Sequence, residues 1–283
     1  MEGLIIKNIS NDYVVKSGDM TYLCKPRGKF RHHGLSPLVG DFVTFDEKEN
    51  YLLKIHPRRN YLIRPSVANV DQAIIVASVK NPDLDRYLLD KLLTVISYHK
   101  IVPFICFTKL DLLNLEELEN LQKIRQYYQE QGYFVTDNLD VKNFEDIFLK
   151  KITVLTGQSG AGKSSLLNRL SPNLKLKTDE ISYALNRGKH TTRHTELYEV
   201  MNGYIVDTPG FSQVSFHGMD KIAIRDNMNE MFSYLEKCKY RDCMHIKEDG
   251  CYVKKMVDDG IISKSRYENY LHFIQEKEEE ERR

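Results

Sequence analysis

The residues with the clearest chemical potential lie at 157–164, which read Gly-Gln-Ser-Gly-Ala-Gly-Lys-Ser and fit the pattern G-x-x-x-x-G-K-[ST] without a mismatch. Glycines let successive backbone N–H groups converge on phosphate oxygens, where a side chain would clash. Lys163 can reach the β- and γ-phosphates of a nucleotide, and the Ser164 hydroxyl can hold Mg²⁺. We therefore predict a nucleotide phosphate site with Lys163 as a catalytic residue. The predicted contacts are Gly157, Gln158, Ser159, Gly160, Ala161, Gly162, Lys163, Ser164 and Ser165.

The elements around this loop support that interpretation. Residues 152–155, Ile-Thr-Val-Leu, have the composition of a buried strand, and residues 165–170, Ser-Leu-Leu-Asn-Arg-Leu, are typical of a helix packed on a sheet. A strand, a glycine-rich turn and a helix are the context that the pattern requires. The amino terminus of the helix adds partial positive charge. The alternative is a glycine-rich turn without a chemical role, but such a turn would not explain why Lys163 and Ser164 follow it.

Two further motifs follow apolar runs that we interpret as strands of the same sheet. Asp207-Thr-Pro-Gly210 resembles the D-x-x-G element of GTPases, in which the Asp contacts Mg²⁺ through water and the glycine N–H senses the γ-phosphate. Thr108-Lys-Leu-Asp111 resembles the N-K-x-D element that reads guanine. A carboxylate at Asp111 can accept hydrogen bonds from N1–H and the 2-amino group of guanine, and adenine has neither donor on that edge. The predicted nucleotide contacts from these motifs are Thr108, Lys109, Leu110, Asp111, Asp207 and Gly210.

Thr108 stands where Asn is usual in the guanine-reading motif. One hydroxyl cannot reproduce a two-ended amide, so we expect weaker base affinity, with Asp111 retaining the specificity. Lys109 is expected to lay its aliphatic stem over the base.

Alternating β and α patterns predict an α/β fold with a parallel, doubly wound sheet at residues 65–218. Strands are expected at 72–79, 101–107, 133–136, 152–155, 197–200 and 204–206, and helices from 81 and over 115–131. Residues 1–64 show five short strands without a convincing helix, at 4–9, 13–16, 21–24, 41–45 and 51–55, which favours an OB-like β-barrel. Residues 219–283 have helical spacing, with methionine and aromatic stripes that we interpret as core.

A cysteine and histidine cluster lies in the third predicted domain. Its pattern is Cys238-x₄-Cys243-x-His245-x₅-Cys251, which offers three thiols and one imidazole within fourteen residues. Zn²⁺ favours four such ligands in a tetrahedral arrangement, and a closed set of this kind is structural. The alternative is that the three cysteines are near one another by chance and bind no metal. The other two cysteines, Cys24 and Cys106, are interpreted as small buried hydrophobic residues.

The barrel region carries basic residues without acidic neighbours. No Asp or Glu occurs at 20–40 or at 51–70, and aromatic residues lie among the charges. Such a surface on a small barrel favours nucleic-acid binding, although ordinary solvated loops give the same pattern. The candidate RNA contacts are Lys25, Arg27, Lys29, Arg31, Arg58 and Arg59.

The overall composition bounds the partners only weakly. The net charge of the 283-residue chain is +1, so any nucleic-acid surface must come from local clustering. No apolar run approaches the roughly 20 residues needed to span a bilayer. The first residues lack the basic start and apolar stretch of a signal peptide, so we expect a cytoplasmic protein without a membrane partner.

The guanine-reading motif precedes the phosphate loop, whereas the order is reversed in ordinary GTPases. A spurious match at Thr108 is one explanation, and a circular permutation that changes only the connections between strands is the other. The permuted order, the barrel and the Cys/His cluster together resemble the ribosome small-subunit-dependent GTPase A family over essentially the whole chain. The resemblance implies a circularly permuted P-loop GTPase with GTP/GDP, Mg²⁺ and one structural Zn²⁺. It also implies a GTP/GDP switch that docks on and leaves the small ribosomal subunit and its rRNA during late maturation.

The resemblance further assigns residues 189–193, Lys-His-Thr-Thr-Arg, to switch I. Thr191 or Thr192 would then approach Mg²⁺, together with Ser164 and Asp207. Phe211 occupies the place of a water-orienting Gln, which predicts slow intrinsic turnover that the small subunit stimulates. His190 is the candidate that positions or deprotonates the water. The alternatives are that His190 contacts an RNA phosphate or that an arginine, Arg187 or Arg193, stabilises the transition state.

The second base contact of GTPases has no clear match here. Its expected place is near 135–138, where Thr136-Asp137 fits poorly. Two other functions stay open at this point. A P-loop ATPase or small-molecule kinase predicts that ATP competes as well as GTP, and an RNA-binding module with a structural nucleotide predicts binding without turnover. We expect a monomer and no DNA partner.

Overall fold

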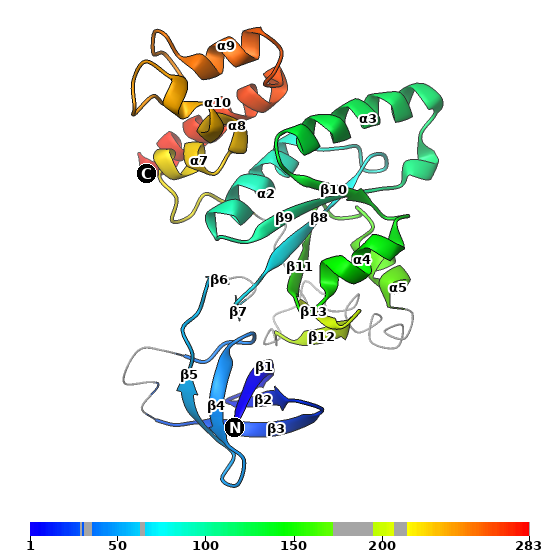
Figure 1. Cartoon of the computed structure of the whole chain (residues 1–283), viewed down its shortest axis with the longest axis vertical. Helices are drawn as coiled ribbons and strands as arrows, with labels where there is room; N and C mark the ends of the chain where they lie inside the picture. Colours follow the sequence, from blue (N-terminus) through cyan, green and yellow to red (C-terminus); the bar gives the residue numbers. More distant parts are fainter. Residues whose placement is uncertain (29, 31–35, 63–65, 172–194, 207–213, 283) are drawn as a thin grey trace. The chain divides into compact units, whose positions relative to one another are not determined.

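The computed structural model describes residues 1–28, 30, 36–62, 66–171, 195–206 and 214–282 (Figure 1). By its internal contacts the chain divides into two compact units. The first contains residues 1–74, 139–156 and 163–211, and the second contains 75–138, 157–162 and 212–283. The three domains predicted from the sequence, with boundaries at 64 and 218, remain a prediction.

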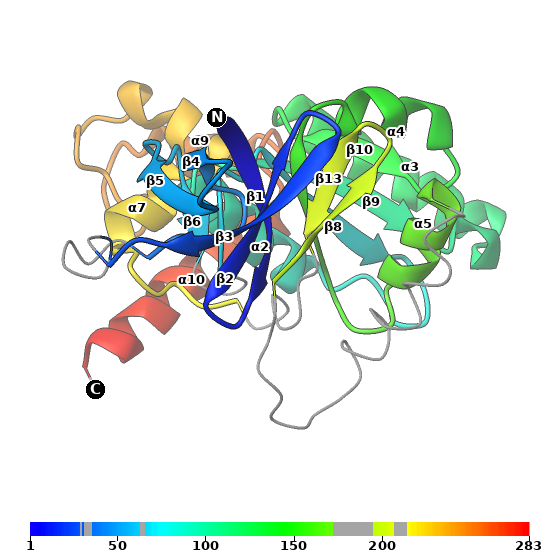
Figure 2. The ribbon, with the colours of Figure 1, turned by 90° about the horizontal axis from the view of Figure 1, so that it is seen from below.

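A closed five-stranded barrel begins the first unit (Figure 2). Its strands are β1 (Glu2–Ile9), β2 (Asp12–Ser17), β3 (Met20–Pro26), β4 (Phe42–Asp46) and β5 (Tyr51–Ile55), in the order β1-β2-β3-β5-β4. Pairing of β1 with β4, with Gly3 opposite Val43, closes the ring. Alternate side chains point inward, and Ile5, Val15 and Phe45 are fully buried. The predicted barrel is confirmed.

Three strands and two helices complete the described part of the first unit, apart from the short hairpin of β6 (Tyr61–Leu62) and β7 (Val67–Ala68). The strands are β11 (Ile152–Thr156), β12 (Leu197–Val200) and β13 (Gly203–Val206), and the helices are α4 (Val141–Phe148) and α5 (Lys163–Leu170). β13 runs parallel to β11 and antiparallel to β12. Just before β12, Glu196 pairs with Lys7 of β1, with Oε2 and Nζ 2.8 Å apart. Barrel and sheet are therefore joined within this unit.

Strand β8 (Gln72–Ser78), all of whose residues are buried, spans the boundary between the two units in the sequence. The strand order is β10-β9-β8-β11-β13-β12. The second unit contributes β9 (Val102–Thr108) and β10 (Phe134–Asp137), which are parallel, with α2 (Arg86–Tyr98), the 3₁₀ turn η1 (Leu110–Leu112) and α3 (Leu115–Glu130). This alternation confirms the predicted α/β sheet, but the prediction that all its strands are parallel was wrong for β12, which runs antiparallel to β13 because a short turn joins the two strands.

Helix α2 starts later than the sequence suggests. The pattern at 81–83 predicts a helix start, but the observed cap is Asp85, whose carboxylate accepts a hydrogen bond from the backbone N–H of Leu88 at 2.9 Å. An acidic side chain at the N-cap satisfies an otherwise unpaired amide. The residues before Asp85 are thereby left to form a turn.

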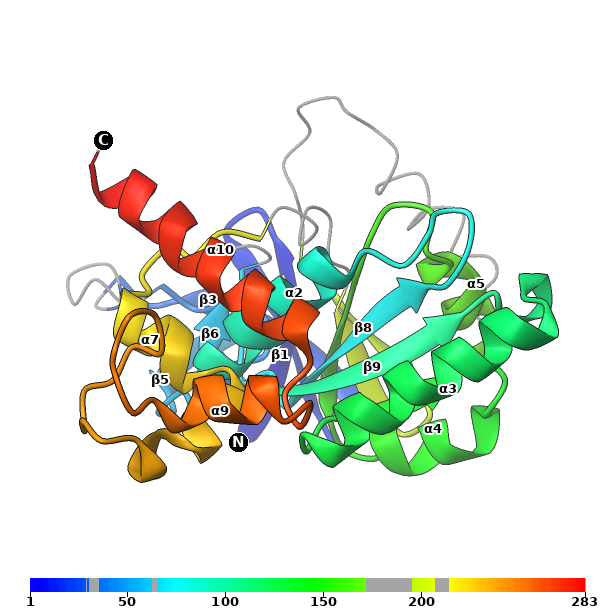
Figure 3. The same ribbon diagram turned by 90° about the horizontal axis from the view of Figure 1, so that it is seen from above.

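The second unit ends in short helices and one long one (Figure 3). These are α7 (Lys221–Asp226), α8 (Asn229–Ser233), η3 (Leu235–Lys237), α9 (Tyr252–Asp258) and α10 (Lys264–Glu281). Figure 3 shows α10 beside α2, and Lys91 of α2 pairs with Glu276 of α10 at 2.5 Å. Met228, Met231, Tyr270 and Ile274 of the predicted methionine and aromatic stripes are buried in the core, whereas Phe232 of the same stripes is 55% exposed. In the described part of the chain, no helix is long and apolar enough to cross a membrane.

A buried arginine connects the helices of the second unit. Arg266 of α10 is completely buried between Asp90 of α2, at 2.6 Å, and Glu230 of α8, at 3.0 Å. Tyr128 of α3 donates its hydroxyl to Asp90 at 2.6 Å, and Tyr133 accepts from Arg266 at 2.8 Å. Burial alone would lower the pKa of Arg266, but the two carboxylates raise it well above its usual value. The guanidinium therefore stays charged inside the core.

Replacing Arg266 with methionine is expected to lower the free energy of unfolding by about 3–5 kcal/mol, because two buried carboxylates lose their cation. Urea unfolding followed by circular dichroism measures the change. The control is Lys264→Met on the same helix, whose side chain is 83% exposed and whose loss is expected to change little. Equal stability of the two variants would show that the buried network contributes nothing.

Candidate nucleotide site and metal centre

The backbone of the phosphate loop takes a shape that requires glycine. Gly157, Gly160 and Gly162 have φ values of +131°, +78° and +94°. A Cβ atom at Gly157 would also collide with the carbonyl oxygen of Val76 in β8. Because L side chains rarely adopt these angles, the glycine spacing is explained by conformation as well as by access to phosphate.

The guanine-reading motif contacts this loop inside the second unit. Thr108, at the end of β9, donates its hydroxyl to the carbonyl oxygen of Ala161 at 2.6 Å. Both residues are buried. Two segments that are far apart in the chain and in the reverse of the usual order are thus directly bonded. This is the arrangement that a permuted GTPase site needs.

The remaining residues of the motif lie in the turn after β9. Lys109 has a left-handed backbone with φ of 62°, and its Nζ donates to the carbonyl oxygen of Asn81. Asp111 is exposed in η1, so its carboxylate is accessible to a ligand. Leu110 is half-buried between them.

Lys163, Ser164 and Ser165 open helix α5 in the first unit, directly after the loop. Lys163 and Ser164 are half-buried and Ser165 is exposed. Burial lowers the pKa of Lys163. A phosphate group bound nearby would raise the pKa again, since opposite charges stabilise one another.

The turn at 78–82 is a third element at this site, and no sequence motif indicated it. Its Val79 N–H donates to the Thr108 carbonyl at 3.2 Å, and Lys80 pairs with Glu117 at 2.8 Å. A Cβ atom at Gly160 would lie 3.5 Å from Pro82 Cδ. The available clue was the position of the turn after a buried strand, at the edge where such sheets bind ligands.

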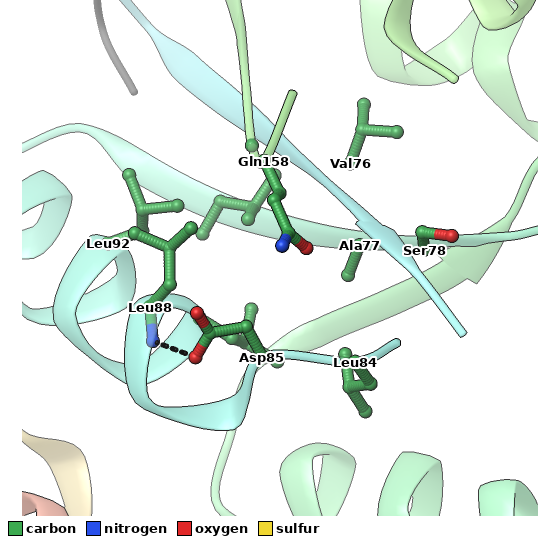
Figure 4. Close-up of a pocket in the computed structure, with 11 residues that line it drawn as sticks. Val76, Ala77, Ser78, Leu84, Asp85, Leu88, Leu92 and Gln158 are labelled. Atoms are coloured by element: carbon green, nitrogen blue, oxygen red, sulfur yellow. Dashed lines mark hydrogen bonds between the residues drawn. The ribbon is translucent and has the colours of Figure 1, made fainter. Parts of the chain in front are cut away.

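A small hollow of about 20 Å³ lies beside the start of the loop (Figure 4). Residues of β8, the first turns of α2, Gly157 and Gln158 line it. Figure 4 shows the Gln158 side chain extending into it above Asp85. This volume holds about one water molecule, so the hollow is no nucleotide pocket.

The predicted metal ligands converge in the second unit. The ligand atoms of Cys238, Cys243, His245 and Cys251 all lie within 4.8 Å of one another. His245 Nδ1 is 3.4 Å from Cys251 Sγ and 3.6 Å from Cys238 Sγ. Three of the residues are buried and Cys238 is half-buried. The grouping predicted from spacing is confirmed.

The protonation states of this cluster fit a metal ion. Burial lowers the pKa of His245 to about 4, so its imidazole is neutral and able to coordinate. Burial raises the pKa of the Cys243 thiol to about 12. A divalent cation would reverse that shift by stabilising the thiolate. Four closely spaced S and N donors therefore fit tetrahedral Zn²⁺.

Outer contacts hold the ligand segment in place. Tyr267 and Tyr270 of α10 donate their hydroxyls to the carbonyl oxygens of His245 and Met244, each at 2.6 Å. The carboxylate of Glu248 accepts from the Met244 N–H at 2.7 Å. These contacts fix the orientation of the ligands. Sequence reasoning missed them, because neither tyrosine nor Glu248 belongs to the ligand pattern.

Several predicted site residues fall outside the described residues: Lys29, Arg31, Arg187, His190, Thr191, Thr192, Arg193, Asp207, Gly210 and Phe211. Near the expected second base contact, Asp137 pairs with Arg125 at 2.9 Å and Thr136 is buried.

The basic residues of the barrel region differ in their surroundings. Lys25 and Arg27 are exposed. Arg58 pairs with the buried Asp41 at 2.7 Å and its side chain is only 16% exposed. Arg59 pairs with Asp71 at 2.7 Å but remains 59% exposed. Arg58 thus stabilises the chain around it, whereas the other three are accessible.

Comparison with known proteins agrees with this architecture. The family model described as RsgA GTPase matches residues 55–217, and the model of the RsgA N-terminal domain matches residues 2–52. The small ribosomal subunit biogenesis GTPase RsgA 2 of Oceanobacillus iheyensis is 46% identical over 283 residues, covering 97% of each chain. The corresponding Bacillus subtilis protein is 42% identical over 288 residues, covering 97% of each chain.

Two solved structures have the same fold. YloQ, described as a circularly permuted GTPase, is 35% identical with a TM-score of 0.85, covering 99% of this chain and 95% of that one. YjeQ from Thermotoga maritima is 31% identical with a TM-score of 0.83, covering 97% of each. The permuted order inferred from the motifs is therefore confirmed.

Proposed function

This chain belongs to the RsgA GTPase family and hydrolyses GTP, and on that premise we propose that it binds the small ribosomal subunit during late maturation. The relatives' shared description as small ribosomal subunit biogenesis GTPases supports the partner. The hydrogen bond from Thr108 to Ala161 supports the nucleotide part of the proposal, because it joins the 108–111 turn to the phosphate loop.

The site residues divide into three roles in this proposal. Asp111 selects guanine, with Lys109 along the base. The loop amides and Lys163 bind the phosphates. Ser164, Asp207 and one of Thr191 and Thr192 hold Mg²⁺, which when bound neutralises charge that develops on the β- and γ-phosphates. His190 positions the attacking water, since the usual Gln position holds Phe211.

The metal centre has a structural role in the proposal. Cys238, Cys243, His245 and Cys251 would take all four positions around a tetrahedral Zn²⁺ and leave none for a substrate.

Two surfaces are proposed to contact rRNA. The first surface, on the barrel side, consists of the exposed Lys25, Arg27 and Arg59, together with Lys29 and Arg31, which are assigned from the sequence alone.

Near the metal centre, Lys237 lies over the rings of Tyr234 and Tyr252, at 5.4 and 5.3 Å from their centroids. Lys239 lies 5.2 Å over Tyr240 in the same way. Tyr240 is exposed, and Tyr234 and Tyr252 are half-buried. Cations beside accessible aromatic rings are a composition that binds single-stranded RNA. Such a surface would hold the GTP state on the subunit, and hydrolysis would favour release.

The proposal is tested by GTP hydrolysis measured with the protein alone, with small subunits and with large subunits. We expect slow turnover alone and stimulation by small subunits only. The variant His190→Ala is expected to lose the stimulated turnover while keeping GTP binding. Stimulation by large subunits, or none by either, would contradict the proposed partner, and full stimulated turnover in His190→Ala would exclude that residue.

Substitution of Asp111 by asparagine is expected to weaken GDP binding roughly 100-fold, because the charged acceptor for two guanine donors is lost. The amide can donate to the C2 carbonyl of xanthine, so the preference should move toward XDP. Titration with labelled GDP and XDP measures both. The control is Asp146→Asn, which changes an exposed carboxylate on α4. Unchanged GDP affinity would show that the 108–111 turn does not read the base.

A further inference from the structure

We propose that Tyr61 is a base-stacking residue for single-stranded RNA, with Arg58 supporting its ring. The inference rests on the rRNA surface proposed for the barrel side and names a residue there that would hold a base. Lysines and arginines explain attraction to phosphate, but phosphate contacts do not say which side chain the bases touch. Tyr61 supplies an aromatic face for that contact.

Tyr61 is the most exposed tyrosine in the described part of the chain. It is 54% exposed, against 44% for Tyr240 and 37% for Tyr51. A single exposed apolar side chain is ordinary in a folded protein, so this exposure alone assigns no role. The surroundings of the ring are what indicate a ligand.

The backbone on both sides of Tyr61 is fixed. Tyr61 pairs with Ala68 across the β6–β7 hairpin, and Leu62 beside it is buried. The Asn60 side chain donates to the Val70 carbonyl at 2.8 Å and accepts from the Val70 N–H at 2.9 Å. The ring therefore extends from a rigid segment, and a base that stacks on it would lose little free energy to ordering of the protein.

A guanidinium lies over the ring and is itself held in place. The Cζ atom of Arg58 is 6.0 Å from the centroid of the Tyr61 ring. Arg58 Nε and Nη2 donate to the two carboxylate oxygens of Asp41 at 2.7 and 2.8 Å, and Nη2 also donates to the Ser36 carbonyl at 2.7 Å. Because Asp41 neutralises its charge, Arg58 is better suited to support the ring than to attract a phosphate.

The charge around Tyr61 suits a polyanion. No Asp or Glu occurs at residues 51–70, and the carboxylates that contact this segment, Asp41 and Asp71, are each paired with an arginine. Arg59, two residues before Tyr61, remains 59% exposed beside Asp71. An accessible ring with arginines close to it in the chain is the combination that holds a base and its phosphate without reading the sequence. Because a double helix keeps its bases stacked inside, the ring favours a single-stranded segment.

The test measures the affinity of the full chain for a fluorescein-labelled RNA of alternating A and C, which cannot pair with itself and is about twelve nucleotides long. For Tyr61→Leu we expect roughly tenfold weaker binding, because base stacking on the ring is lost. Tyr61→Phe keeps the ring and should bind as the wild type does. The dependence of affinity on salt should be unchanged in Tyr61→Leu, whereas Arg59→Met should lower its slope by roughly 0.7, since a phosphate contact is lost.

The matched control is Phe134→Leu. Phe134 is an aromatic residue of similar exposure, 57%, on β10, and it belongs to neither proposed surface. Its replacement should leave the RNA affinity unchanged. A loss as large as that of Tyr61→Leu would overturn the inference, because the effect would not depend on the ring of Tyr61.

A second readout does not depend on the leucine variant. The chain contains no tryptophan, so Tyr61→Trp introduces a single indole. A stacked base quenches indole fluorescence, so the emission of this variant should fall when the RNA binds, and that of Phe134→Trp should not. Wild-type affinity in Tyr61→Leu, or unquenched emission from Tyr61→Trp with the RNA bound, overturns the inference and leaves the proposed surface in place. A wild type that does not bind the RNA would overturn the proposed surface together with the inference.

Discussion

GTP hydrolysis is expected to fall roughly 10³-fold when Lys163 is replaced by alanine, with or without ribosomal subunits. Lys163 is the cation that follows the phosphate loop, and its place at the start of α5 adds the partial charge of the helix amino terminus. Phosphoryl transfer depends mainly on neutralising charge on the phosphates. Single-turnover hydrolysis at saturating GTP separates this loss from weaker binding.

The matched control is Lys151→Ala, an exposed lysine just before β11. The hydrogen bond from the Lys151 backbone N–H to the Phe148 carbonyl does not involve the side chain, so the substitution keeps it. We expect wild-type turnover for this variant. Retention of more than about a tenth of the activity in Lys163→Ala would remove the residue from the catalytic machinery, because loss of one such donor typically reduces the rate at least 100-fold. A Lys163→Arg variant tests geometry, since a planar guanidinium replaces a compact ammonium.

The sequence was more informative about local motifs than about the long-range contacts that hold those motifs in place. The phosphate loop and the metal ligands are local patterns, and local spacing is visible in a sequence. The permutation could be inferred because the guanine-reading motif at 108–111 and the phosphate loop at 157–164 each follow a predicted strand and occur in the reverse of the usual order. By contrast, the bond from Thr108 to Ala161 joins a side chain to a main-chain carbonyl, which leaves no residue pattern.

Charge was harder to interpret than motifs. Arg58 lies in a stretch without acidic residues, yet it pairs with Asp41, which is seventeen residues earlier. Counting charges in one stretch of sequence cannot show which distant carboxylate the fold brings into contact with an arginine. The helix start at 81–83 was wrong for a similar reason, because several polar residues in a row can cap a helix and tertiary contacts select among them.

The helix α4 was not predicted. It has only eight residues, about two turns, which is shorter than the stretch from which a helix is usually recognised in a sequence.

The second large effect concerns the metal centre. Replacing Cys243 with serine is expected to abolish zinc binding and to lower the midpoint of thermal unfolding by roughly 10 °C. Cys243 is fully buried in the core of the second unit, in the same cluster as Met231 and Phe273. Serine removes a thiolate ligand and leaves a hydroxyl where sulfur was packed. Since α10 donates to the ligand segment through Tyr267 and Tyr270, loss of the metal should also loosen that helix.

Metal analysis of the purified protein and thermal unfolding with and without a chelator measure the two parts of this effect. The wild type should contain one zinc per chain and lose stability when the chelator is added, whereas the variant should contain none and should not respond. The control is Cys106→Ala, which removes a thiol in the sheet whose pKa burial raises to about 12. That variant should keep its zinc and its response to the chelator. If the Cys243 variant retained a full equivalent of zinc, the four converging side chains would be core residues and no metal centre.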